Sequence, residues 1–136
     1  MVEAQFLARF RQLSRVAAWV LIAIIAVLSF IPPGYRPVTP VPHNVEHLSI
    51  FLPTGLALGV GYERRHLLQS LALVLYAGAV ELIQLQIPGR HGRLSDFLVN
   101  AVSACLGVGL ALLIPWVAHR IRRSAWRRAS RRGPKD

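Results

Sequence analysis

The sequence predicts an all-α protein that crosses a membrane as a bundle of four transmembrane helices. Hydrophobic residues make up 54% of the 136 residues and charged residues only 16%, a balance that is unusual for a soluble domain. Four apolar runs, separated by short segments rich in Pro, Gly or Arg, approach the ~30 Å that a helix must cover to cross the hydrocarbon core. Most of the 16 Lys and Arg residues lie outside these runs. The basic residues responsible for the net charge of +10 therefore lie mainly outside the helices and not within them.

The first helix is predicted from a basic segment that leads into an apolar run. Residues 1–15 carry three arginines among Phe and Leu, and we expect a short interfacial helix or arm there. Residues 16–31 are apolar apart from Ser29, and the run from Ser14 onward is long enough to span. A signal peptide shares this pattern, but a Pro-Pro-Gly sequence follows instead of a small-residue cleavage site. We therefore predict an uncleaved span.

The second and third helices follow a loop, residues 32–42, that contains five prolines. Proline lacks the backbone N–H and clashes inside helices, so this loop should be extended. The second apolar run covers about residues 45–61, and Pro53 within it predicts a kink. A basic turn at residues 62–66 then leads into the third run, residues 67–87. That run is long enough to cross with some tilt.

The fourth helix follows a loop at residues 88–94 that carries Gly and Arg. Ser95 is expected to be its N-cap, and Asp96 lies in the first turn, where the helix dipole favours an acid. The apolar run ends near Val117. The predicted organisation is a basic arm at residues 1–15, one membrane domain at residues 16–118 and a basic tail at residues 119–136.

The distribution of basic residues predicts the orientation. If the amino terminus is cytoplasmic, thirteen of the 16 Lys and Arg residues fall in the inside segments and only Arg36, Arg90 and Arg93 fall outside. Cytoplasmic segments of membrane proteins carry such an excess. We therefore expect a multi-pass protein of the cell inner membrane with both termini cytoplasmic. The basic tail should anchor to anionic lipid, and we expect no binding to nucleic acid.

Polar residues gather at the outer ends of the third and fourth helices. Glu81 and Gln84 are three residues apart and Asp96 and Asn100 are four apart, so each pair shares a helix face. A charge at membrane depth costs at least ~2.5–3.5 kcal/mol, which makes such residues functional candidates by default. Below Asn100 the same face carries small residues, as a close helix contact requires. We therefore predict that the third and fourth helices pack on these faces.

The loop between these helices should roof a polar pocket, with arginine side chains neutralising the buried acids. Glu46 and His47, at the outer start of the second helix, would form another wall. The predicted ligand-binding residues are Glu46, His47, Glu81, Gln84, Arg90, Arg93, Asp96 and Asn100. The structural alternative is that Asp96 only caps its helix and Glu81 only pairs with an arginine to hold the bundle.

The sequence does not favour a metal site. His43 and His47 are four residues apart and could bind zinc together with His91 or an acid, but His43 follows Pro42 at a frayed helix end. We expect no metal and no cofactor. The single cysteine, Cys105, lies in an apolar run and is interpreted as a small buried residue.

At these residues the chain resembles the VanZ-like family of small bacterial membrane proteins. The resemblance covers about residues 29–115 and rests on His47 with Phe51, Glu81-x-x-Gln84, Pro88-Gly89-Arg90, Asp96, Asn100 and Gly107. The family often has Asp and Lys where this chain has His43 and Asn44. The family is named for a protein linked to resistance to teicoplanin, a glycopeptide antibiotic. The resemblance implies a polytopic fold and a role in the cell envelope, but no reaction.

Three functional interpretations follow. The first is a noncatalytic protein whose outer pocket binds an anionic lipid headgroup or a lipid-linked cell-wall precursor. The arginines would hold the phosphate in that case. The second is a membrane enzyme that uses Glu81 or His47 as acid or base on such a lipid. A small transporter subunit, or a homo-oligomer around a pathway, is a third alternative.

Overall fold

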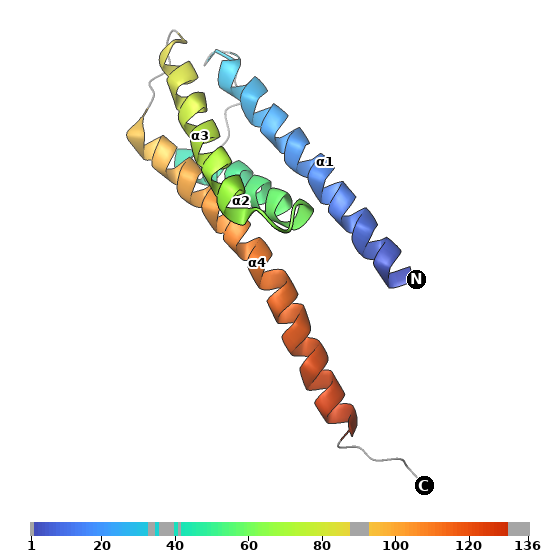
Figure 1. Cartoon of the computed structure of the whole chain (residues 1–136). Coiled ribbons are helices and arrows are strands. Elements are labelled where there is room, and N and C mark those ends of the chain that lie inside the picture. The colour runs from blue at the N-terminus through green and yellow to red at the C-terminus, as the bar shows by residue number, and fades with distance from the viewer. Residues whose placement is uncertain (1, 33–34, 36–39, 41, 88–92, 131–136) are drawn as a thin grey trace.

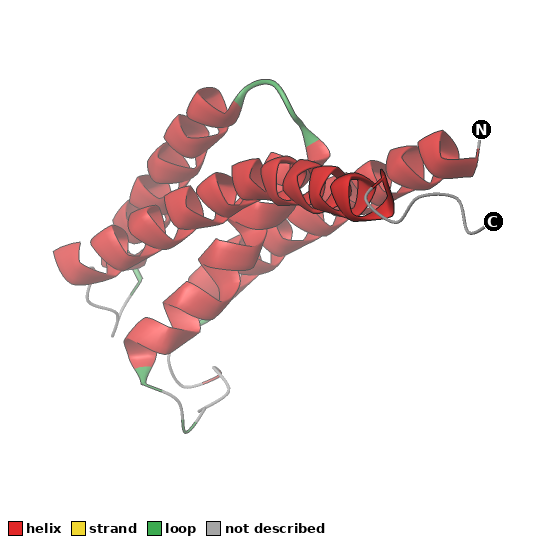
Figure 2. Ribbon diagram, turned by 90° about the horizontal axis from the view of Figure 1, so that it is seen from below, coloured by secondary structure: helices red, strands yellow, loops and turns green. Residues whose placement is uncertain are grey.

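A computed structural model describes residues 2–32, 35, 40, 42–87 and 93–130 of the chain. These residues form α1 (Val2–Phe30), α2 (His43–Gly61), α3 (His66–Leu85) and α4 (Leu94–Ser130), and no strand occurs among them. The predicted all-α, four-helix architecture is confirmed. Figure 1 shows the later part of α4 projecting beyond the other three helices. Figure 2 shows the same bundle from below.

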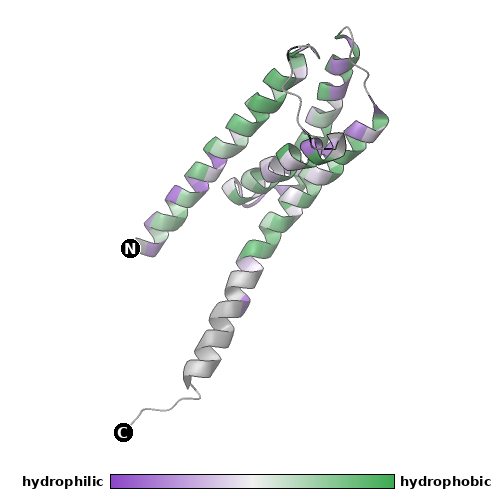
Figure 3. Cartoon of the chain, turned by 180° about the vertical axis from the view of Figure 1, so that it is seen from behind, coloured by the Kyte–Doolittle hydropathy of each residue, from purple (hydrophilic) through white to green (hydrophobic). Residues whose placement is uncertain are grey.

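Three helices are long and apolar enough to cross a membrane, by length and composition: Glu3–Phe30, His66–Leu85 and Leu94–Trp116. The apolar part of α2, Val45–Gly61, is shorter, about 26 Å at ~1.5 Å per residue. Figure 3 shows apolar residues along most of the helix surfaces, with hydrophilic residues near the start of α1 and around the end of the bundle where α4 begins. The chain is a membrane protein, as its composition predicts.

Helix α1 extends further toward the amino terminus than the predicted first span. The arm expected at residues 1–15 and the span form one continuous helix. No Pro or Gly occurs between Val2 and Phe30 to break it, and Ala, Leu, Arg and Gln all favour helix. Helix α4 likewise continues through Pro115 to Ser130 and so includes much of the predicted tail.

The predicted N-cap of α4, Ser95, is wrong by two positions, because Arg93 precedes the first helical residue. The helix begins at Leu94, so Ser95 is its second residue. The hydroxyl of Ser95 donates to the Asp96 carboxylate at 3.1 Å instead of accepting a backbone N–H. The Arg93 carbonyl accepts the first bonds of the helix, from the amides of Asp96 and Phe97. Asp96 does lie in the first turn, as predicted.

The most extensive helix contact joins α2 to α4 through glycines. A Cβ atom on Gly107 would overlap the carbonyl oxygen of Leu52 and lie 2.7 Å from the backbone nitrogen of Leu56. A Cβ atom on Gly55 would overlap the carbonyl oxygen of Ala104. The two backbones therefore touch directly, which is the packing that small residues allow between membrane helices.

This contact corrects the partner predicted for the small face of α4. Gly107 and Ala111 pack on α2, because Gly55 and Gly59 leave room there for a second backbone. The predicted contact of α3 with α4 exists but is less extensive. In that contact a Cβ atom on Gly78 would lie 3.6 Å from the Phe97 ring, an ordinary van der Waals distance.

Helix α1 packs against α2 and holds the α2–α3 turn. Arg15 donates to the carbonyl of Gly61 at 2.7 Å, and its guanidinium lies 4.8 Å from the centre of the Tyr62 ring. Arg11 pairs with Glu63 at 2.5 Å. Both ends of that pair are exposed, so it contributes at most ~1 kcal/mol. Arg11 and Arg15 thus flank the apolar part of α1 and also bond to the α2–α3 turn.

Side chains from all four helices meet in one apolar core. Phe51 of α2 lies at its centre with 1% of its surface exposed, and its ring centroid is 6.5 Å from that of Tyr76. The Tyr76 hydroxyl donates to the carbonyl of Ile22 at 2.7 Å and so links α3 to α1. The remaining members of the core are Ala18, Ile25, Leu58, Leu73, Ala77, Val80, Ala104 and Val108.

Replacing Gly107 with Ala should destabilise the bundle by about 1–3 kcal/mol, because the added methyl group forces the α2 and α4 backbones apart. The matched control is Gly109→Ala in the same helix, where the space around a Cβ atom is open. Unfolding of the purified protein in mixed detergent measures both. Equal stability of the two variants would show that the close contact does not hold the bundle together.

Candidate functional site

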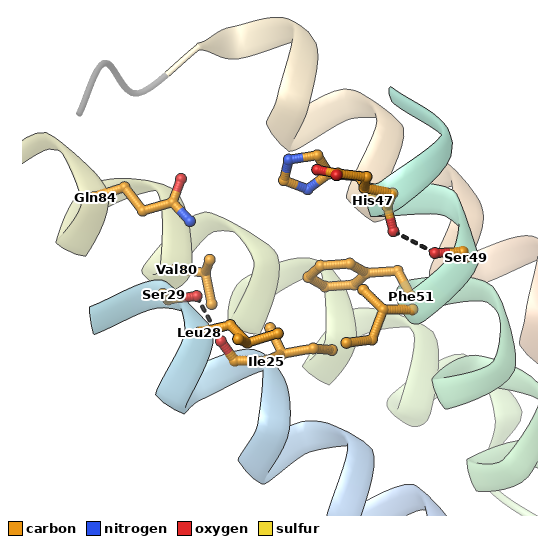
Figure 4. A pocket seen from close by; sticks show the side chains of 10 residues that line it. Ile25, Leu28, Ser29, His47, Ser49, Phe51, Val80 and Gln84 are labelled. Atoms are coloured by element: carbon orange, nitrogen blue, oxygen red, sulfur yellow. Dashed lines mark hydrogen bonds between the residues drawn. The ribbon is translucent and has the colours of Figure 1, made fainter. Parts of the chain in front are cut away.

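A pocket of about 250 Å³ lies between α1, α2 and α3, near the end of the bundle where α4 begins. Its polar lining residues are Ser29, Glu46, His47, Ser49 and Gln84, and its apolar ones are Ile25, Leu28, Ile50, Phe51 and Val80. Figure 4 shows Gln84 and His47 on opposite sides of the pocket, with Phe51 below them in this view. The pocket is therefore polar on some of its walls and apolar elsewhere.

The α2 wall of the pocket is supported from behind by α4. The Nδ1 atom of His47 lies 2.8 Å from Oδ1 of Asn100, and both side chains are buried. Asn100 is fully buried and its Nδ2 atom has no hydrogen-bond partner among the described residues. The glycine contact further along the two helices permits this approach, because it brings the backbones of α2 and α4 together.

Glu81 on α3 is bonded to the start of α4. Its Oε1 atom accepts a hydrogen bond from the backbone N–H of Arg93. Glu81 is buried with 8% of its surface exposed, so this bond places a carboxylate inside the protein and ties the end of α3 to the first turn of α4. A hydrogen bond from a backbone N–H to an ionised carboxylate is stronger than one between two neutral groups.

The structure brings most of the predicted site residues together. Glu46, His47 and Gln84 line the pocket. Glu81, Asp96 and Asn100 are buried beside the α3–α4 end and do not line the pocket. The loop between α3 and α4 was predicted to cover the pocket. Its residues 88–92, which include Arg90, lie outside the described part of the chain.

Arg93 contacts Glu81 through a different group from the one predicted. Arg93 does meet Glu81, but through its backbone N–H rather than its guanidinium. Its side chain is exposed and makes no ion pair with a described residue. The reason is geometric: residue 93 immediately precedes Leu94, the first residue of α4, where backbone N–H groups lack partners within the helix and bind a nearby carboxylate.

The α1 wall of the pocket was not predicted. Ile25, Leu28 and Ser29 form this wall, whereas the predicted site residues all come from the other three helices and the loop between α3 and α4. The sequence contained one indication of a wall from α1: Ser29 is the one polar residue of the first apolar run. Its hydroxyl donates to the carbonyl of Ile25 at 2.6 Å, so it is satisfied within its own helix.

The described residues contain no group of three or more His, Cys, Asp or Glu side chains placed to hold a metal ion. What the site offers is hydrogen bonding next to apolar surface. The Gln84 amide can both donate and accept, and no hydrogen bond to it occurs within the described chain. Such a lining suits an amphiphile, which has a polar part and an apolar part.

The comparisons with known proteins identify one family. The model of the family described as VanZ/LLP1 matches residues 3–115, which include every predicted site residue and most of the four helices. No curated protein and no solved structure matches the chain.

Glu81→Ala should lower the stability of the protein by about 1–3 kcal/mol, because the backbone N–H of Arg93 loses its charged acceptor. Glu81→Gln keeps an oxygen in the same place and should cost less. Detergent unfolding of the two variants and the wild type tests this. Equal losses would show that the bond between Glu81 and Arg93 contributes nothing to stability.

Proposed function

The chain belongs to the VanZ/LLP1 family, and we propose that it binds the phosphate-bearing headgroup of a lipid in the pocket between α1, α2 and α3. Anionic phospholipids and lipid-linked cell-wall precursors are the two classes of ligand that we expect. The observation that supports this most is the Gln84 amide. It lies in the pocket lining with its hydrogen-bonding capacity unused by the described residues.

The apolar part of the lining supports a lipid rather than a soluble ligand. Leu28, Ile50 and Val80 lie beside the polar groups and would contact the first carbons of the acyl chains. Burying apolar surface contributes about 25 cal/mol per Å². A water-soluble headgroup analogue would not gain this contribution.

The phosphate would be held by arginine at the outer end of the bundle. Arg93 has an exposed guanidinium. Its backbone N–H is bonded to Glu81, which lies one turn of α3 away from Gln84. A guanidinium binds phosphate through two parallel hydrogen bonds. Arg90, predicted for the same role, lies outside the described residues.

A membrane enzyme acting on the same lipid is the second candidate, and the bond between His47 and Asn100 favours it. A histidine oriented by a buried amide is one way to present an acid or base. Glu81, the other catalytic candidate, is bonded to the Arg93 amide and does not line the pocket. An enzyme would change the mass of a bound lipid and lose this activity in His47→Gln, whereas a binder would leave the lipid unchanged.

We also propose that all four helices cross the inner membrane and that both termini are cytoplasmic. Helix α2 is short, yet its start shares the pocket with Ser29 of α1 and its end at Gly61 is bonded to Arg15 of α1. Fourteen residues of α1 separate Ser29 from Arg15, or ~21 Å at ~1.5 Å per residue. Helix α2 thus runs beside α1 over about half of the length of α1, in the opposite direction.

Gln84→Leu should weaken the binding of dioleoylphosphatidylglycerol by about fivefold to tenfold, since one or two buried hydrogen bonds are lost. Native mass spectrometry of the purified chain, titrated with this lipid, measures the affinity. Gln86→Leu is the matched control, because Gln86 is exposed just beyond α3 and does not line the pocket. Equal binding by all three proteins would contradict a lipid site at this pocket.

Reporter fusions after Pro40 and after His91 should report the periplasm, and a fusion after Arg64 should report the cytoplasm. The excess of basic residues at the opposite ends of the helices predicts this arrangement. Alkaline phosphatase and green fluorescent protein activities of the three fusions provide the measurement. A cytoplasmic signal after both Pro40 and His91 would contradict four crossings with both termini inside.

A further inference from the structure

We propose that Gln84 binds the acyl carbonyl of a lipid, and that the pocket therefore selects lipids whose chains are attached as acyl groups rather than as ethers. The proposal rests on the proposed function and names the part of the ligand that Gln84 recognises. The proposed function concerns whether a lipid binds in the pocket. This proposal concerns how its chains are linked to the glycerol.

The argument begins with the polar groups of the pocket lining that are already in use. The Ser49 hydroxyl donates to the carbonyl of Glu46 at 2.7 Å. Ser29, Glu46 and His47 each have interactions of their own within the protein. Gln84 is the remaining polar residue of the lining, and its side chain has no hydrogen-bond partner among the described residues. A ligand in the pocket therefore has the Gln84 amide, with two N–H donors and one acceptor oxygen, available to it.

The pocket has a polar layer and an apolar layer, one helix turn apart. On each of its three helices a polar lining residue lies four positions from an apolar one, so the two share a helix face and are ~6 Å apart along the axis. The polar residue is the nearer of the two to the helix end at this side of the bundle. Figure 4 shows Gln84 above Val80, with Ile25 and Phe51 lower in this view. The polar residues are Ser29, His47 and Gln84, and the apolar residues are Ile25, Phe51 and Val80.

The lining favours an uncharged group beside Gln84. No Lys or Arg occurs among the described residues that line the pocket. A phosphate in contact with the Gln84 amide would therefore meet no positive charge from this lining, and burying a charge without a partner costs far more than burying a neutral polar group that is hydrogen-bonded. The exposed guanidinium proposed to bind the phosphate belongs to Arg93, which does not line the pocket.

An acyl carbonyl satisfies both conditions. Its oxygen accepts hydrogen bonds without carrying a net charge, and its carbon is bonded directly to the first methylene group of the chain. With the carbonyl at the Gln84 amide, the chain would continue one turn deeper, against Val80 and Phe51. The phosphate, on the other side of the glycerol, would lie toward Arg93. An ether-linked lipid has the same phosphate and chains but gives Gln84 no carbonyl oxygen.

The first experiment compares two lipids that differ only in this linkage. Dioleoylphosphatidylglycerol and its dioleyl diether analogue have the same headgroup and the same chain length. Native mass spectrometry of the full chain, titrated with each lipid, should show the ester lipid binding about fivefold more tightly, the effect of one hydrogen bond. Dioleoylphosphatidylcholine and its diether analogue should show the same ratio, because Gln84 reads the carbonyl and not the headgroup. A ratio that disappears with the choline headgroup would overturn the proposal.

The second experiment removes the amide. Gln84→Leu should bind the ester and ether lipids with affinities that agree within about a factor of two, both close to the affinity of the wild type for the ether lipid. Gln86→Leu is the matched control, since Gln86 is exposed just beyond α3 and does not line the pocket. The fivefold preference should be unchanged in this control.

A second variant covers the case in which Gln84→Leu does not fold. Gln84→Met keeps the length of the side chain and removes the amide, and it should lose the preference for the ester lipid in the same way. The comparison of the two lipids on the wild type needs no variant. Equal binding of ester and ether lipids by the wild type would by itself overturn the proposal.

The outcomes also separate the two proposals. If the wild type binds both linkages equally and Gln84→Leu weakens both, Gln84 contacts another part of the lipid, and only this inference fails. A preference for the ester lipid that persists in Gln84→Leu or Gln84→Met also overturns it, because the carbonyl would then be recognised elsewhere. If no lipid binds, or if Gln84→Leu leaves every affinity unchanged, the proposed function fails as well.

Discussion

The direct contact between the backbones of α2 and α4 is the constraint on which the rest of this structure depends. Gly55 and Gly107 lie where the two helices cross, and neither position has room for a Cβ atom. In a membrane, helices gain little from excluding water from one another, so association depends on such close packing. The same crossing keeps the outer turns of α2 and α4 in register. His47 can meet Asn100 only because the backbones touch further along.

Three hydrogen bonds of polar side chains join different elements of this bundle. His47 with Asn100 joins α2 to α4, and Glu81 with the Arg93 amide joins α3 to α4. The Tyr76 hydroxyl joins α3 to the α1 carbonyl of Ile22. A polar group without a partner in such surroundings would cost several kcal/mol. The pairs therefore restrict which helices can be neighbours, and the pocket lies between three of these helices.

The two ends of the bundle use their charges differently. At the end formed by the α2–α3 turn, Arg11 and Arg15 bind the turn itself, through Glu63 and the Gly61 carbonyl. At the other end, Glu46 lines a pocket and the exposed Arg93 side chain pairs with no described residue. One end is thus closed by contacts within the chain, while the pocket lies toward the other end.

The sequence by itself determined the helical class, the approximate bounds of the four apolar helices, the family, and most of the polar residues near the pocket. These follow from local patterns: apolar runs, proline and glycine breaks, and the rarity of Glu81 and Asn100 in such runs. The tertiary structure decided which faces meet. The small face of α4 packs on α2 rather than α3, α1 supplies a wall of the pocket, and Arg93 offers Glu81 an amide instead of a guanidinium. Helical periodicity shows which residues share one face of a helix. It does not show which neighbouring helix packs against that face. That choice depends on the shapes of two surfaces distant in sequence, here on whether a backbone can approach where Gly55 and Gly59 leave space.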